Sequence, residues 1–75
     1  MEFEKLCAMI AETLGCDVDQ ITESTQLVED LGADSLSLVE LAMAIEESTG
    51  VTVEDSALPT LKTVGDIAAY IQANS

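Results

Sequence analysis

Residues 30–50 read DLGADSLSLVELAMAIEESTG, and this stretch decides the fold. A glycine turn leads into an amphipathic segment that ends at Gly50, which predicts a helix from Ser35 to about Thr49. Asp34 is the better N-cap, so Ser35 is expected on the first helical turn, exposed and fixed in position. A catalytic serine needs a base within hydrogen-bond reach, and the chain has no histidine. We therefore interpret Ser35 as a residue that another enzyme modifies.

This central helix has apolar residues on two opposite faces. One face is an ordinary core stripe with helical spacing, formed by Leu38, Leu41, Ala42 and Ile45. The opposite face mixes apolar with acidic side chains, namely Leu36, Val39, Met43, Glu40, Glu46 and Glu47. Single exposed apolar residues are common on protein surfaces. Three of them on one face, beside an exposed serine, favour a docking surface for partner proteins.

Further helices are expected on both sides of this segment. The apolar spacing that begins at Phe3 predicts a first helix that ends at Leu14, directly before Gly15. Thr63 and Asp66 match a capping box, which predicts the start of the last helix. The core stripe of that helix is expected to contain Val64, Ile67, Ala68 and Ile71.

Two connections join these helices. Residues 16–34 form a long first connection, and connections of this length in small domains are usually functional. Its apolar residues are expected to pin it to the core: Ile21, Leu27, Val28 and Leu31. Residues 51–53 are interpreted as a buried linker, and residues 54–58 are expected to form a short helical turn ended by Pro59. The pattern indicates an all-α fold with three longer helices and one short one.

Length and charge limit the possible functions. A chain of 75 residues indicates one small domain, residues 1–75, with no room for a separate catalytic domain. Fifteen acidic residues and two basic ones give a formal charge of −13, so we expect no binding to nucleic acid and no membrane insertion. Basic patches on other proteins are the natural partners of such a surface.

The two cysteines and the rest of the composition limit the possible disulfides, metal sites and location of the protein. Cys7 lies on the apolar stripe of the first helix and Cys16 follows it, so both are expected to be unpaired and to pack like small apolar residues. With no histidine and no further cysteine, we expect no metal site. No signal peptide or transmembrane run is apparent, so we expect a cytoplasmic protein, and we expect it to be a monomer.

The central stretch, followed by Val39-Glu40-Leu41 and Met43-Ala44-Ile45-Glu46-Glu47, strongly resembles the acyl carrier proteins. The resemblance extends over nearly the whole chain and implies a four-helix bundle. It also implies that Ser35 carries a 4′-phosphopantetheine arm, which a separate phosphopantetheinyl transferase moves from coenzyme A. Asp34 and Leu36 would flank the attachment point. The chain would then be a non-catalytic carrier that holds acyl groups as thioesters.

The same resemblance implies which proteins this chain meets and where its cargo lies. Acyl-processing enzymes with basic docking patches would meet the helix at Leu36, Val39, Glu40, Met43, Glu46 and Glu47. The core has few aromatic residues and several alanines, so its helices can separate at limited cost. We expect an acyl chain to slide between the central and last helices, near Leu38, Ala42, Ile45 and Ala68.

Several readings remain open at this stage. The favoured one is a carrier that delivers intermediates to the separate enzymes of fatty acid synthesis. A carrier of a polyketide, D-alanine or other specialised pathway is the nearest alternative, because it would share the fold and the serine. Ser37 stands where the common bacterial pattern has an acidic residue, which leaves the pathway undecided. A calcium-binding regulator is a distant third, because the run that begins at Asp17 lacks the third oxygen ligand and the glycine that a calcium loop requires.

Overall fold

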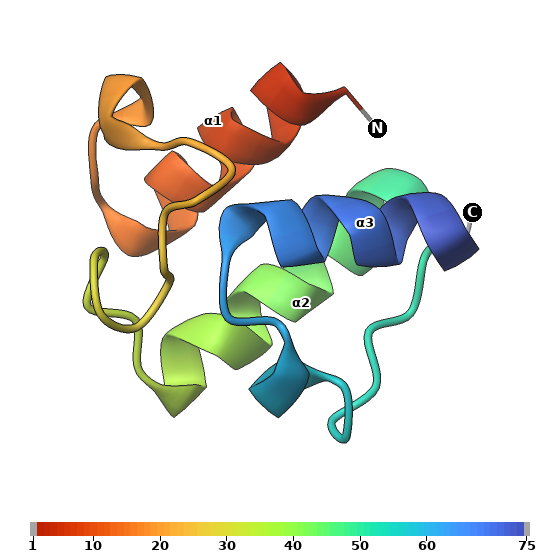
Figure 1. Ribbon diagram of the computed structural model, residues 1–75. Helices are drawn as coiled ribbons and strands as arrows, with labels where there is room; N and C mark the ends of the chain where they lie inside the picture. Colours follow the sequence, from red (N-terminus) through yellow and green to blue (C-terminus); the bar gives the residue numbers. More distant parts are fainter. Residues whose placement is uncertain (1, 75) are drawn as a thin grey trace.

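The structure is a computed structural model, and residues 2–74 of it are described here. Figure 1 shows three α-helices: α1 (Phe3–Leu14), α2 (Ser35–Thr49) and α3 (Val64–Asn74). Two single turns of 3-10 helix, η1 (Val18–Gln20) and η2 (Leu58–Thr60), interrupt the connections. No β-strand forms within residues 2–74. The all-α fold with three longer helices and one short one is therefore confirmed, with η2 in the place of the short helix.

The bounds of α1 and α2 follow from local sequence. Both helices end at a glycine in the left-handed region, Gly15 at φ 72° and Gly50 at φ 75°, where other residues are strained. The backbone N–H of each glycine donates to a carbonyl of the last helical turn. At the other end of α2, Asp34 is the N-cap that the sequence predicts. Local capping alone therefore fixes the helix that carries Ser35.

The core lies where the three helices meet. Helix α1 packs against both α2 and α3, and α3 crosses in front of α2 in Figure 1. The fully buried side chains of this core are Leu6, Ile10, Leu27, Leu41, Ile45 and Val64. Cys7 is buried in the same cluster, Cys16 is half-buried, and neither forms a disulfide. Both cysteines thus pack as small apolar residues, as expected.

The first turn of α3 is held by the predicted capping box. The Thr63 hydroxyl accepts a hydrogen bond from the Asp66 backbone N–H at 3.1 Å, and the Asp66 carboxylate accepts one from the Thr63 N–H at 3.2 Å. The same carboxylate also accepts from the Lys62 N–H at 3.1 Å. These bonds satisfy backbone donors that have no partner within the helix.

The first loop, residues 16–34, completes this cap with its own carbonyls. The Val64 N–H donates to the Thr25 carbonyl at 3.0 Å, and the Gly65 N–H donates to the Glu23 carbonyl at 2.9 Å. A Cβ atom at Gly65 would lie 3.0 Å from that Glu23 oxygen, so glycine permits the close approach. The first loop and the start of α3 are thereby joined.

Leu27 links this junction to the residues before Ser35. Its N–H donates to the Lys62 carbonyl and its carbonyl accepts from the Ala33 N–H, both at 2.9 Å. Its side chain is 1% exposed. Leu27 therefore ties the residues before Ser35 to the core and to the segment that precedes α3.

Two expectations about the connections need correction. Val28 is 57% exposed, because Leu27 and Ala33 occupy the inward positions of this part of the loop. A helical turn does form at residues 54–58, where the Ala57 and Leu58 N–H groups donate to the Glu54 carbonyl, but it does not end at Pro59, because η2 follows it directly and contains that proline. Proline is tolerated there because the first residues of a helix need no intrahelical N–H bond.

Candidate functional site

The candidate site is the first turn of α2. Ser35 is the first residue of this helix and is exposed. Beside it, the Asp34 carboxylate accepts a hydrogen bond from the Ser37 backbone N–H at 2.8 Å. This bond, with further help from the Ser37 hydroxyl, lowers the pKa of the Asp34 carboxyl below its ordinary value. An ionised cap thus fixes the backbone on which the Ser35 hydroxyl stands.

The chemistry of this turn suits modification by another protein. Ser35 is reachable from solvent, and the chain supplies no histidine to activate it. The N-terminal end of α2 carries partial positive charge, which favours an anionic group such as a phosphate attached there. A phosphodiester on the Ser35 oxygen would therefore fit the local electrostatics.

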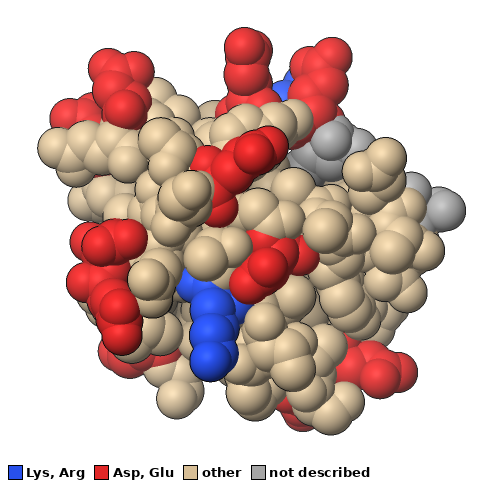
Figure 2. All heavy atoms as spheres, viewed as in Figure 1, with Lys and Arg blue, Asp and Glu red and all other residues tan. Residues whose placement is uncertain are grey.

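The face of α2 next to Ser35 exposes the apolar residues that the sequence singled out. Leu36 is 68% exposed, Met43 60% and Val39 41%. The carboxylates of the same predicted set, Glu40, Glu46 and Glu47, are also exposed. We call these six residues the docking surface. Figure 2 shows, on the α3 side of the molecule, carboxylates spread widely and basic atoms only near the middle and at the upper edge.

An apolar cavity lies behind α2, on the side away from the docking surface. Its walls are Leu27, Leu38, Leu41, Ala42, Ile45, Val53, Leu58, Leu61 and Ile67. Its volume is about 10 Å³, which is about the space of one water molecule. The predicted cargo residues Leu38, Ala42 and Ile45 therefore lie together on one wall.

The remaining walls differ from the expected ones. Ala68 is not a wall residue, and its neighbour Ile67, which is 2% exposed, takes that position on α3. Sequence reasoning missed Val53, Leu58 and Leu61, which come from the connection between α2 and α3. The spacing by three residues of Leu58 and Leu61, which are the first residue and the C-cap of η2, was the available signal.

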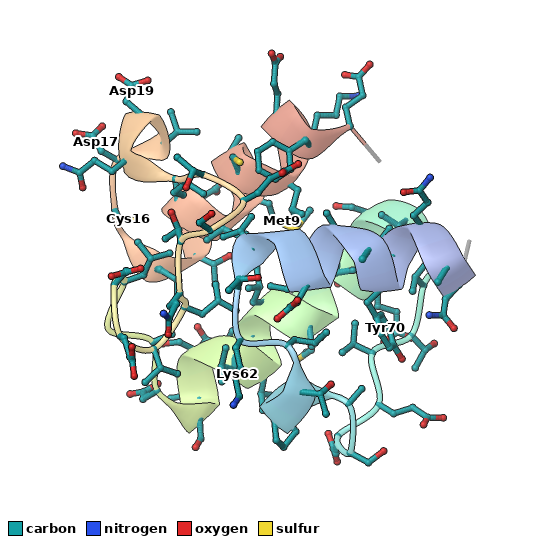
Figure 3. The ribbon with its side chains drawn as sticks, viewed as in Figure 1. Met9, Cys16, Asp17, Asp19, Lys62 and Tyr70 are labelled. Carbon is teal, nitrogen blue, oxygen red and sulfur yellow. The ribbon has the colours of Figure 1, made fainter. Side chains whose placement is uncertain are left out.

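The surface along α1 and η1 lies outside the candidate site. An open groove along α1, with Met9 on its wall, includes none of the predicted site residues. Asp17 is the N-cap of η1 and Asp19 lies within it, and both side chains extend outward in Figure 3. Within residues 2–74, no cluster of three or more His, Cys, Asp or Glu side chains could hold a metal ion. In the same range, no helix has both the length and the apolar character needed to cross a membrane.

Comparisons with known proteins show the family of the chain. The family described as "Phosphopantetheine attachment site" matches residues 4–71. The acyl carrier protein of Thermotoga maritima is 50% identical over 70 residues, which cover 93% of this chain and 86% of that protein. The acyl carrier protein of Helicobacter pylori strain G27 is 47% identical over 72 residues, 96% of this chain and 92% of that protein. The solved acyl carrier protein of Enterococcus faecalis has a TM-score of 0.82 at 30% identity, over 97% of this chain and 92% of that one. The chain therefore belongs to the acyl carrier proteins of the phosphopantetheine-attachment family, whose cofactor is a covalently bound 4′-phosphopantetheine.

Proposed function

We propose that Ser35 is the attachment residue, flanked by Asp34 and Leu36, and that the chain carries acyl intermediates of fatty acid synthesis to separate enzymes. The observation that supports this most directly is an exposed hydroxyl on the first turn of α2, held in place by the cap of Asp34. The arm supplies a terminal thiol that holds the acyl group as a thioester. The chain supplies the anchor, the docking surface and the cavity.

The chain acts as a carrier, and its partners perform the catalysis. A phosphopantetheinyl transferase installs the arm, and acyl-processing enzymes act on the thioester. We propose that these reactions take place in the cytoplasm. The absence of histidine from the chain supports catalysis by the partner enzymes, because the chain has no imidazole base that could activate Ser35 or the thiol of the arm.

Intact-protein mass spectrometry tests the attachment residue. Arm-free protein is incubated with coenzyme A and a broad-specificity phosphopantetheinyl transferase, and we expect one phosphopantetheine to be added. Ser35→Ala should stay unmodified, whereas the matched control Ser37→Ala should be modified as the wild type is. Circular dichroism of each variant checks that it is folded. Modification of Ser35→Ala would show that another residue carries the arm.

The docking surface is proposed to meet basic patches on partner enzymes. Its carboxylates Glu40, Glu46 and Glu47 steer the approach, and Leu36, Val39 and Met43 are then buried against the partner. Steering by charge raises association rates and weakens as salt is added. Leu36, Val39 and Met43 are the large apolar side chains that α2 exposes, so they supply apolar area to the final contact.

The apolar cavity is proposed to shelter the acyl chain. Leu38, Ala42 and Ile45 form its α2 wall, and Ile67, beside the predicted Ala68, forms its α3 wall. Each methylene moved from water into this interior is worth roughly 0.8 kcal/mol, before the cost of opening the bundle. Longer saturated chains should therefore raise the melting temperature stepwise until the cavity is filled. A melting temperature that does not change with chain length would contradict sheltering and leave the attachment at Ser35 intact.

A further inference from the structure

The connection between α2 and α3 forms one wall of the cavity. We call residues 53–61 the lid, because this segment supplies Val53, Leu58 and Leu61 to that wall. Local bonds shape the lid: the N–H groups of Ala57 and Leu58 donate to the Glu54 carbonyl, and those of Thr60 and Leu61 donate within η2. Both partners of each of these bonds lie within the lid, so the bonds would persist if the lid moved as a unit.

The two ends of the lid are held differently. At its far end, the Lys62 carbonyl accepts from the Leu27 N–H at 2.9 Å, and the Lys62 N–H donates to the Asp66 carboxylate at 3.1 Å. At its near end, the Tyr70 hydroxyl donates to the Thr52 carbonyl at 3.3 Å. Figure 3 shows Tyr70 extending from α3 toward this connection. A neutral bond at 3.3 Å is weaker than the shorter backbone bond and the charge-assisted bond at the other end.

Thr52 is well placed to control the lid. The residue before it, Val51, is 4% exposed in the core, and its N–H donates to the Thr49 hydroxyl at 3.1 Å. The residue after it, Val53, lines the cavity. The bond from Tyr70 therefore holds the backbone between a fixed residue and the first residue of the lid.

We propose that Tyr70 is a latch that sets the length of acyl chain the carrier can shelter. A cavity of about 10 Å³ cannot take an acyl chain without enlarging, so one of its walls must move. The lid and Leu27 are the walls outside the longer helices, and Leu27 is held by backbone bonds to Lys62 and Ala33. The lid is therefore the wall that moves, and it opens at its Thr52 end. The hydrogen bond from Tyr70 to Thr52 must break for the lid to open further, so it opposes the entry of additional methylenes into the cavity. This inference rests on the proposed sheltering of the chain.

The test compares three proteins: wild type, Tyr70→Phe and Thr25→Val. Tyr70→Phe keeps the ring and removes the hydroxyl. Thr25→Val is the matched control, because it removes a hydroxyl whose hydrogen bonds are to Thr22 and Gln20 in the first loop, among them one from the Thr22 N–H at 2.8 Å. Each protein is prepared with the arm alone and with saturated thioesters of increasing length, and each form is melted by circular dichroism.

A second readout needs no cargo. Hydrogen exchange of the Ala57, Leu58, Thr60 and Leu61 amides, followed by NMR in the arm-only form, reports opening of the lid. Loss of one neutral hydrogen bond should raise the exchange rates of these amides about fivefold in Tyr70→Phe. The same amides should exchange at the wild-type rate in Thr25→Val.

The latch predicts that the melting temperature of Tyr70→Phe continues to rise at chain lengths where the wild type has reached its plateau. Thr25→Val should start from a lower melting temperature and reach its plateau at the wild-type length. An unchanged plateau and unchanged exchange in Tyr70→Phe would overturn the latch while leaving sheltering intact. A flat series in all three proteins would instead reject sheltering itself and, with it, any control of chain length by Tyr70.

Discussion

Substitution of Ile45 by valine measures directly whether the cargo reaches the cavity. Ile45 is 1% exposed and lines the cavity from α2. Removing one buried methylene costs about 0.5–1.5 kcal/mol, because transfer free energy is lost and a small void remains. A chain of 75 residues has a free energy of unfolding of roughly 4–11 kcal/mol, so the variant should stay folded. The melting temperature of the arm-only form should fall by about 2–12 °C.

An acyl chain in the cavity should recover part of this loss. If the chain occupies the space vacated in Ile45→Val, it regains about 0.8 kcal/mol for one buried methylene. The melting temperature of the acylated form should then fall by about 3–6 °C less than that of the arm-only form. The assay is a set of thermal melts followed by circular dichroism, with wild type and variant each in the arm-only and the acylated form. These four melts form a thermodynamic cycle that gives the coupling free energy between residue 45 and the acyl chain.

Ile10→Val is the matched control for this cycle. Ile10 is 0% exposed on α1 and is not a wall residue of the cavity, so its truncation should cost the same in both forms. Equal losses for Ile45→Val in the arm-only and acylated forms would refute the reasoning, because the chain would then make no contact with this wall. Equal recovery in both variants would also refute it, since the stabilisation would then be general.

Three further outcomes are expected. Glu40→Lys combined with Glu47→Lys should slow association with a basic partner enzyme several-fold at low salt, measured by stopped flow, and a rate independent of salt in the wild type would contradict electrostatic steering. The lowered pKa of the Asp34 carboxyl means that its contribution to stability is present at neutral pH and is lost as the pH falls through that folded-state pKa. Asparagine at position 34 still caps the helix but does not titrate, so the melting temperature of Asp34→Asn should fall less than that of the wild type between pH 7 and pH 3. Burial, and secondarily the charge of Glu4, raises the pKa of the Cys7 thiol, so a thiol reagent should label Cys16 first in arm-free protein, and equal rates would contradict this assignment.

The helices could be predicted from sequence because their ends depend on neighbours in the chain. The predicted bounds of the first two helices agree with Phe3–Leu14 and Ser35–Thr49. Glycine in the left-handed region and an aspartate cap act within one turn, so no distant contact is needed to place them. The exposure of Leu36 and Met43 was predictable for the same reason, since helical spacing determines which face a residue occupies.

The connections required the tertiary structure. Nothing near Gly65 in the sequence indicates that its missing side chain admits the Glu23 carbonyl from the first loop. Likewise, Val28 is exposed because Leu27 and Ala33, and not Val28, fill the space between the first loop and the core. Such choices are made by contacts between residues that are distant along the chain, which local periodicity does not record.

The sequence by itself therefore determined the helices, the exposed serine at the start of the central one, and the surface beside it. Only the tertiary structure decided what encloses the cavity: Ile67 in place of Ala68, the lid residues after α2, and the bond from Tyr70 to Thr52. The physical reason is that capping and helical periodicity are local, whereas a cavity wall depends on the packing of segments that are brought together only by the folded core.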